Sequence, residues 1–179
     1  DTDYGRYARY PVKTHVITKD DVLEDVLDKY VKDYIQPGDT IIMSEKIVAI
    51  SQGRAFPIEE IKVSRLAKIL SHFVVKTNYG IGLGMPETME LCIREVGRPK
   101  VLWAAFCAAI GKLFHKHGVF YNICGMKARA IDGPCEYTLP PYNHYAKMAP
   151  DKPDEVAARL TKHLGIDVVI IDANDIGAN

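Results

Sequence analysis

The sequence has few of the features that mark secreted, membrane-spanning or nucleic-acid-binding proteins. Its 23 basic and 23 acidic residues give a formal net charge of zero, so it lacks the positive field that draws a protein to nucleic acid or to an anionic membrane. The longest apolar run covers only residues 101–110, about half of the roughly 20 residues needed to cross a bilayer. Residues 1–9 show no hydrophobic signal region. We therefore expect a cytoplasmic protein with no nucleic-acid partner and no membrane partner.

The sequence also lacks the cysteine spacing of a disulfide framework or a zinc site. No CxxC pair occurs among its four cysteines, which are Cys92, Cys107, Cys124 and Cys135. His115 and His117 are near neighbours, but no further Cys or His pair completes a zinc site. We expect reduced thiols that pack inside the fold. A hydrolase that uses Cys124 or Cys135 together with His117 is an alternative.

No P-loop or dinucleotide fingerprint is present, although glycine recurs at Gly80, Gly82 and Gly84. No Gly-Lys-Ser/Thr follows these glycines, and no strong strand leads into them. Two interpretations remain open: a plain connector, or a loop that closes over a phosphate-containing site.

Apolar periodicity predicts helices mixed with short strands. Helical patterns cover residues 18–35, 45–52, 57–73, 86–96, 101–113 and 153–164, and strand patterns cover residues 40–43, 119–123 and 166–171. Thr18 and Ser44 are the expected N-caps of the first two helices. Because the strands and helices do not alternate regularly, the sequence predicts an α+β fold.

The segment from Ser44 to Arg54 is a candidate phosphate site. A strand that feeds a helix through a polar cap leaves backbone amides unpaired at the junction, which favours an anion. Lys46 adds a point charge there, and Arg54 can offer a planar fork to a phosphate or carboxylate. Ser44, Lys46, Ser51 and Arg54 are therefore the candidate nucleotide ligands. The alternative is an amphipathic helix with solvated basic side chains.

Three acidic residues, Asp132, Asp172 and Asp175, are candidate ligands of a hard cation. Asp132 precedes Gly133, which lets the backbone approach a ligand, while Asp172 and Asp175 follow the strand pattern at 166–171. Carboxylates combined with phosphate oxygens are the usual ligands of Mg²⁺ or Mn²⁺. The alternative for an aspartate at a strand end is a turn or N-cap role.

Five segments in the same chain order resemble the coenzyme F420-0:L-glutamate γ-ligase family. They are GDTIIMSEKIVAISQGR at 38–54, ETMELCIRE at 87–95, HGVF at 117–120, Ile-Asp at 131–132, and the helix and strand at 149–171. The resemblance covers most of the chain from about Tyr10 onward.

The resemblance implies a two-lobed α+β fold with mixed sheets flanked by helices, and a homodimer. It also implies a ligase that uses GTP, or ATP, and Mg²⁺ or Mn²⁺ to activate a carboxylate acceptor as an acyl phosphate, which L-glutamate then converts to an amide. On this basis Lys46 and Arg54 would hold the phosphates, and Asp132 with Asp175, or Asp172 in its place, would hold the cations.

The sequence departs from the family pattern in three places, one of which is residues 172–179 (DANDIGAN), where the family has Ser-Asp-Thr-Phe-Gly-Arg. Residues 126–130 are additional, and Gly133-Pro134-Cys135 replaces the family's Ala-Ser-Asn after the aspartate. We expect residues 1–179 to form a single γ-glutamyl-ligase-like unit that lacks the family's C-terminal segment. The alternative function is a non-catalytic nucleotide- or phosphate-binding module of the same fold.

Overall fold

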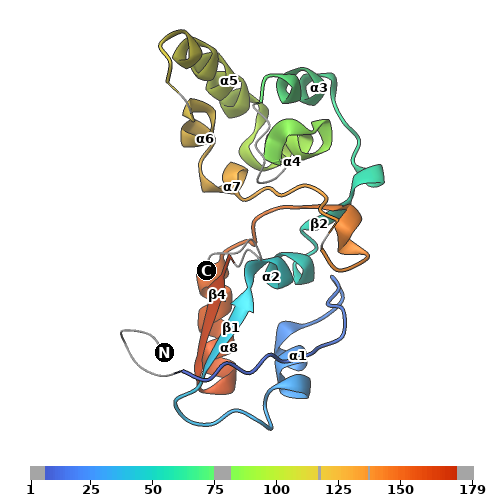
Figure 1. The fold of residues 1–179 in the computed structure, drawn as a ribbon, viewed down its shortest axis with the longest axis vertical. Helices are drawn as coiled ribbons and strands as arrows, with labels where there is room; N and C mark the ends of the chain where they lie inside the picture. Colours follow the sequence, from blue (N-terminus) through green and yellow to red (C-terminus); the bar gives the residue numbers. More distant parts are fainter. Residues whose placement is uncertain (1–6, 75–81, 117, 137, 173–179) are drawn as a thin grey trace. The chain divides into compact units, whose positions relative to one another are not determined.

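The chain divides into two units in a computed structural model that describes residues 7–74, 82–116, 118–136 and 138–172 (Figure 1). One unit, here called the split unit, comprises Asp1–Ser51 and Lys152–Asn179. The other, here called the central unit, comprises Gln52–Asp151. Each unit combines helices with a two-stranded sheet, which confirms the α+β fold.

The split unit is built around two parallel strands. Its elements are α1 (Leu23–Tyr30), β1 (Thr40–Ser44), α2 (Glu45–Ser51), α8 (Pro153–Leu164) and β4 (Asp167–Ile171). The register runs from Thr40 opposite Asp167 to Ser44 opposite Ile171. Apolar side chains from all five elements form one core, which includes Leu27, Met43, Val48, Leu160 and Val168. The predicted strands 40–43 and 166–171 and the predicted helix 153–164 are therefore confirmed.

Helix α1 begins later than the sequence predicts. Thr18 does not cap it, because the Asp21 carboxylate accepts hydrogen bonds from the Thr18 amide (2.7 Å) and the Thr18 hydroxyl (2.9 Å) and so closes a turn. Such local side-chain bonds compete with helix formation. The helix starts at Leu23 after an extended Val22, and it ends at Tyr30, short of the predicted Ile35.

The central unit is mainly helical. Its helices and strands are β2 (Ala55–Pro57), α3 (Arg65–His72), α4 (Pro86–Val96), α5 (Arg98–Leu113), α6 (Val119–Cys124), α7 (Met126–Arg129) and β3 (Tyr145–Lys147), with 3-10 turns η1 (Ile58–Glu60), η2 (Gly82–Gly84) and η3 (Tyr142–His144). Helix α4 lies at the centre of the core, since six consecutive residues from Thr88 to Ile93 are buried. Its predicted bounds are confirmed: Pro86 starts it, and Gly97, with φ of 91°, ends it.

Two predicted elements of the central unit are wrong. The helix predicted over 57–73 is interrupted after η1, and α3 starts only at Arg65, where the Ser64 side chain accepts a hydrogen bond from the Ala67 amide. The strand predicted over 119–123 is helix α6. A short apolar run does not distinguish a strand from a buried helix. Here the close packing of Val119 against α5 favours the helix. A Cβ on Gly111 would lie only 2.9 Å from Val119 Cγ2.

The sheet of the central unit pairs β2 and β3 antiparallel, and a single bridge adds Asp132 to its other side. Lys147 is thereby the middle position, opposite Ala55 on one side and Asp132 on the other. The two ends of the unit are hydrogen-bonded to each other. Gln52 Nε2 donates a hydrogen bond to the Asp151 carbonyl (2.8 Å), and Gln52 Oε1 accepts one from the Asp151 amide (2.7 Å).

Candidate functional site

The junction of β1 and α2 has the geometry predicted for Ser44. The Ser44 Oγ accepts a hydrogen bond from the Lys46 amide at 3.3 Å, so Ser44 caps α2 as expected. Ser44 and Lys46 are both half-buried. The cap therefore places one hydroxyl and one ammonium-bearing side chain in the first turn after the strand.

Asp172 belongs to the same end of the split unit as this junction. It directly follows β4, and the register sets Ile171 opposite Ser44. Because parallel strands carry their carboxyl ends at one edge, about 4.8 Å apart, the backbone of Asp172 lies beside the start of α2. Ligands of open parallel sheets bind at this edge. The structure thus brings Ser44, Lys46 and Asp172 to one corner of the split unit.

Ser51 lies at the other end of α2. It lies seven positions after Ser44, which is about 10 Å along a helix axis. Its hydroxyl donates a hydrogen bond to the Val48 carbonyl at 2.9 Å. Ser51 is therefore not part of the corner formed by Ser44, Lys46 and Asp172.

Arg54 is held in an ion cluster of the central unit. Its guanidinium contacts the Glu95 carboxylate at 3.0 Å and donates a hydrogen bond to the Ala149 carbonyl at 2.5 Å. Lys127 contacts the second oxygen of Glu95 at 2.8 Å. Only 19% of the Arg54 side chain and 11% of the Glu95 side chain are exposed. Arg54 therefore has a demonstrated structural partner in addition to its predicted role toward phosphate.

The ion cluster also controls the ionisation of Glu95. Burial alone would raise the pKa of this carboxyl group, but hydrogen bonds from Lys127 and Arg54 and their positive charges outweigh burial, so the pKa is lowered. Glu95 is therefore a carboxylate at neutral pH, and it joins α4, α7 and the segment before β2.

Asp132 shares a face of the small sheet with a buried lysine. The amide and carbonyl of Asp132 exchange hydrogen bonds with those of Lys147, at 2.9 and 2.8 Å. Directly opposed residues of an antiparallel pair direct their side chains to one face. Lys147 is 2% exposed, and its ammonium donates a hydrogen bond to the Tyr142 carbonyl at 3.3 Å. This face therefore carries one carboxylate and one ammonium.

No local sequence pattern points to Lys147. The missing information is the long-range register, since nothing local to residues 145–147 indicates that they pair with Asp132. The alternation of a strand also directs Arg54 away from the face that carries Ala55, Lys147 and Asp132. Arg54 and Asp132 are thus not brought to one face of the central unit.

An open hollow of about 400 Å³ adjoins β3 in the central unit. Its lining residues include Pro57, Glu59, Pro134, Pro141, His144 and Tyr145. The volume falls within the range of small-molecule sites, and proline and tyrosine surfaces suit the ring or aliphatic part of a ligand. Pro134 belongs to the segment that immediately follows Asp132.

Three remaining candidates, Asp175, Gly80 and His117, lie outside the described residues. Within the ranges that the structure describes, no three side chains of His, Cys, Asp or Glu converge as a metal cluster. Asp172 and Asp132 each offer one carboxylate, a hard oxygen ligand of the type that Mg²⁺ shares with phosphate oxygens.

The cysteines of the core do not form an exposed nucleophile. Cys92 and Cys124 are buried and hydrogen-bonded to each other, and this contact together with burial raises the pKa of the Cys92 thiol. Both thiols therefore pack inside the fold, as the sequence predicts. Over the described part of the chain, every helix is too short or too polar to cross a bilayer.

Comparison with known proteins gives one family. A family model described as F420-0:Gamma-glutamyl ligase matches residues 11–175. The match includes both units of the chain. No curated protein matches the sequence.

Proposed function

Because the chain belongs to the F420-0:gamma-glutamyl ligase family, we propose that it forms an amide between L-glutamate and a carboxylate acceptor, driven by GTP or ATP. The observation that carries this proposal is the family match over residues 11–175. The acceptor that the family name indicates is F420-0. We also propose that the active form is a homodimer.

The proposed reaction has two steps. An oxygen of the acceptor carboxylate attacks the γ-phosphorus, and the nucleoside diphosphate leaves with the electron pair of the broken P–O bond. The glutamate amine then attacks the acyl carbon of the resulting acyl phosphate, loses a proton, and releases inorganic phosphate. Two or more phosphates and a carboxylate must share the site, so their mutual repulsion is the main electrostatic obstacle.

The corner of the split unit supplies residues suited to the nucleotide. Lys46 would contact a phosphate as a point charge, and the Ser44 hydroxyl can donate a hydrogen bond to a phosphate oxygen while its oxygen caps α2. Asp172 at the end of β4, or Asp175 in its place, would offer a carboxylate to Mg²⁺ or Mn²⁺. The cation would neutralise charge on the transferred phosphoryl group.

The face that carries Asp132 and Lys147 is a polar face of the central unit. The Lys147 ammonium is held in place by the sheet and by the Tyr142 carbonyl, so it presents a fixed positive charge. We assign Asp132 to a Mg²⁺ or Mn²⁺ ion, and the hollow beside β3 to an uncharged part of the acceptor.

One observation supports the alternative of a binding module without ligase activity. The Arg54 guanidinium, which the family resemblance assigns to phosphate, is bonded to Glu95 and to the Ala149 carbonyl. Such a module would bind GTP or ATP without turnover, which separates it from a ligase in a single assay.

The test is to incubate the chain with F420-0, GTP or ATP, L-glutamate and Mg²⁺ or Mn²⁺, and to measure the acceptor's mass and the release of phosphate. A ligase adds one glutamyl residue to the acceptor and releases phosphate only when acceptor, glutamate and cation are all present. Asp132→Asn should lower the rate at least about tenfold. Nucleotide binding with no product in any combination would establish the binding module instead.

A further inference from the structure

Helix α5 carries a wide apolar face that the core of the central unit leaves uncovered. Val101, Ala104 and Gly111 are buried on its inner side. The large exposed apolar side chains of α5 and of the residue after it form the outer face of α5, which consists of Leu102, Trp103, Phe106, Ile110, Leu113 and Phe114. At about 100° per residue, the five that belong to the helix fall within roughly 100° of its circumference. The outer face is therefore one stripe along α5.

Helix α3 exposes apolar side chains beside the carboxyl end of α5. The Lys112 ammonium of α5 donates a hydrogen bond to the Phe73 carbonyl at 3.0 Å, so the ends of the two helices meet. Phe73, which follows α3, is 69% exposed, and Ile69, four residues earlier, is exposed as well. Residues four apart lie on the same side of a helix. Two helices thus present apolar side chains to the solvent at this end of the unit.

The outer face is large for a protein surface without a partner. Trp103 is 59% exposed and Phe106 is 57% exposed. With the other four side chains, the exposed apolar area is roughly 600 Å². The largest apolar patch of a soluble monomer is typically about 300–600 Å², and a patch of that size often marks a contact site. The charges around the outer face indicate which kind of partner it fits.

The chain is neutral overall, but the two units carry opposite net charges. The central unit contains 13 Lys and Arg and eight Asp and Glu, whereas the split unit contains 10 and 15. Residues 61–86 and 96–131, which include α3 and α5, contain ten Lys and Arg and no Asp or Glu. The expectation of no membrane partner was based on the net charge of the whole chain. This division of charge removes that basis.

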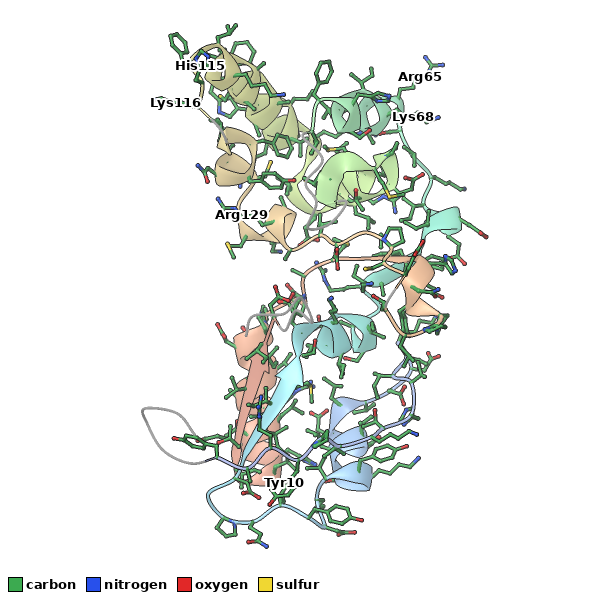
Figure 2. The ribbon with its side chains drawn as sticks, in the orientation of Figure 1. Tyr10, Arg65, Lys68, His115, Lys116 and Arg129 are labelled. Carbon is green, nitrogen blue, oxygen red and sulfur yellow. The ribbon has the colours of Figure 1, made fainter. Side chains whose placement is uncertain are left out.

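Cations border the outer face at both of its ends. Lys100 lies in the first turn of α5 and Lys112 in its last turn, and both are exposed. Figure 2 shows Lys116, beyond the end of α5, at the same end of the central unit as Arg65 and Lys68 of α3. No charged residue occurs between Lys100 and Lys112, so the middle of the outer face can lose water without burying a charge. An apolar face with a basic border is complementary to an anionic lipid surface.

Charge and side-chain type distinguish a lipid surface from two other partners. A second copy of the chain on the outer face would bring two basic borders together, and like charges oppose that contact. Single-stranded nucleic acid stacks its bases on aromatic rings, but Leu102, Ile110 and Leu113 offer no ring. Aliphatic side chains combined with a tryptophan and flanking lysines are typical of helices that lie in the interface of a membrane.

We propose that the central unit binds the surface of an anionic lipid membrane. The outer face of α5 inserts between the headgroups, and the basic residues of α3 and α5 contact the lipid phosphates. With 16 residues, α5 is shorter than the roughly 20 residues needed to cross a bilayer, so the helix lies along the surface. The inference goes beyond the proposed reaction and does not depend on it. The proposed homodimer then forms through a different face.

The first test uses the fluorescence of the unmodified 179-residue chain. Trp103 is the only tryptophan in the sequence, so tryptophan emission reports on the outer face alone. Vesicles of phosphatidylcholine with about 30% phosphatidylglycerol should shift this emission to shorter wavelength, because the ring leaves water. Vesicles of phosphatidylcholine alone should bind at least about tenfold more weakly, since the basic border then has no anionic partner. Raising the salt from about 0.1 to 0.5 M NaCl should weaken binding to the anionic vesicles.

The second test measures vesicle affinity by co-sedimentation of variants. Phe106→Glu places a charge in the middle of the outer face and should lower the affinity for anionic vesicles about 30-fold or more. Lys68→Ala removes one cation and should lower it about fivefold. Leu139→Glu is the matched control, because Leu139 is an exposed apolar residue of the same unit that belongs to neither helix, and its effect should stay below about threefold. Circular dichroism shows that each variant is folded.

The alternatives give different results in the same experiments. Unchanged Trp103 emission with anionic vesicles would overturn the proposal, and so would binding that survives Phe106→Glu. If vesicles have no effect and sedimentation shows a dimer that Phe106→Glu dissociates, the outer face contacts a second copy instead. If a single-stranded oligonucleotide quenches the Trp103 emission and vesicles do not change it, the outer face binds nucleic acid instead.

Discussion

Glu95 joins two cations that belong to different elements of the central unit. Its carboxylate contacts Arg54 before β2 and Lys127 on α7, and its pKa is lowered because these contacts outweigh the effect of burial. A glutamate with a depressed pKa stabilises the folded state above its ordinary value of 4.5, and this contribution is lost as the pH falls through the folded-state value.

Glu95→Gln should therefore reduce the free energy of unfolding by about 2 kcal/mol at pH 7. The difference from the wild type should shrink as the pH falls below about 4.5 and vanish once the wild-type carboxyl is protonated. Urea unfolding at a series of pH values measures this. Glu60→Gln is the control, since Glu60 is exposed and should change stability by no more than about 0.5 kcal/mol. A constant difference at all pH values would contradict the assigned role of Glu95.

Asp172 and Asp167 provide a matched pair at opposite ends of β4. Asp172 follows the strand beside the start of α2, and Asp167 begins the strand at its other end. Asp172→Asn is expected to weaken Mg²⁺-dependent GTP binding about tenfold or more, because it removes one carboxylate ligand. Asp167→Asn should leave it unchanged. Isothermal titration with and without Mg²⁺ measures both, and equal effects of the two changes would remove Asp172 from the nucleotide site.

At the scale of elements, local signals predicted several helix ends at which the end residue acts on its own backbone. Pro86 and Gly97 bound α4, Ser44 caps α2, and Gly165, with φ of 75°, ends α8. The same reasoning failed at Thr18, because Asp21 competes for its amide and hydroxyl. Local propensity shows which residues are able to cap a helix. A competing side chain nearby, such as Asp21 here, can prevent the helix from starting at that residue.

Helix α6 shows the second limit of sequence reasoning. Residues 119–123 have a strand-like composition, yet they form a helix that packs closely on α5. The close approach depends on Gly111 of α5, which lies outside the segment 119–123 and is in contact with Val119. Tertiary packing of this kind overrides β-propensity, and no periodicity within residues 119–123 encodes it.

Gly111→Ala tests that packing. The added Cβ would lie 2.9 Å from Val119 Cγ2, so the α5–α6 contact must open, at an expected cost of about 1–3 kcal/mol in the free energy of unfolding. Val119→Ala removes the opposing methyl group and should recover part of that loss in the double variant, which a double-mutant cycle by urea unfolding quantifies. Additive effects of the two changes would show that they do not meet.

At the scale of the whole molecule, motif order predicted the family. The candidate site was only partly predictable. Ser44, Lys46 and Asp172 share one corner because parallel strands end at one edge. The pairing of Asp132 with Lys147 depends on a register across a long loop, and that register cannot be inferred from local sequence.

The split unit is discontinuous in sequence, and the central unit is inserted into it as one continuous segment. The chain enters the central unit at Gln52 and leaves it at Asp151. The Gln52 side chain makes two hydrogen bonds to the Asp151 backbone. Both chain crossings are therefore fixed to each other within the central unit. The family match includes both units.

The most direct test of the proposed ligase activity follows an oxygen atom. F420-0 labelled with ¹⁸O in its reactive carboxylate is incubated with the chain, GTP, Mg²⁺ and L-glutamate, and the released phosphate is analysed by mass spectrometry. An acyl phosphate route transfers one labelled oxygen to the phosphate for each amide formed. Phosphate released without the label, or released at the same rate without the acceptor, would contradict the account.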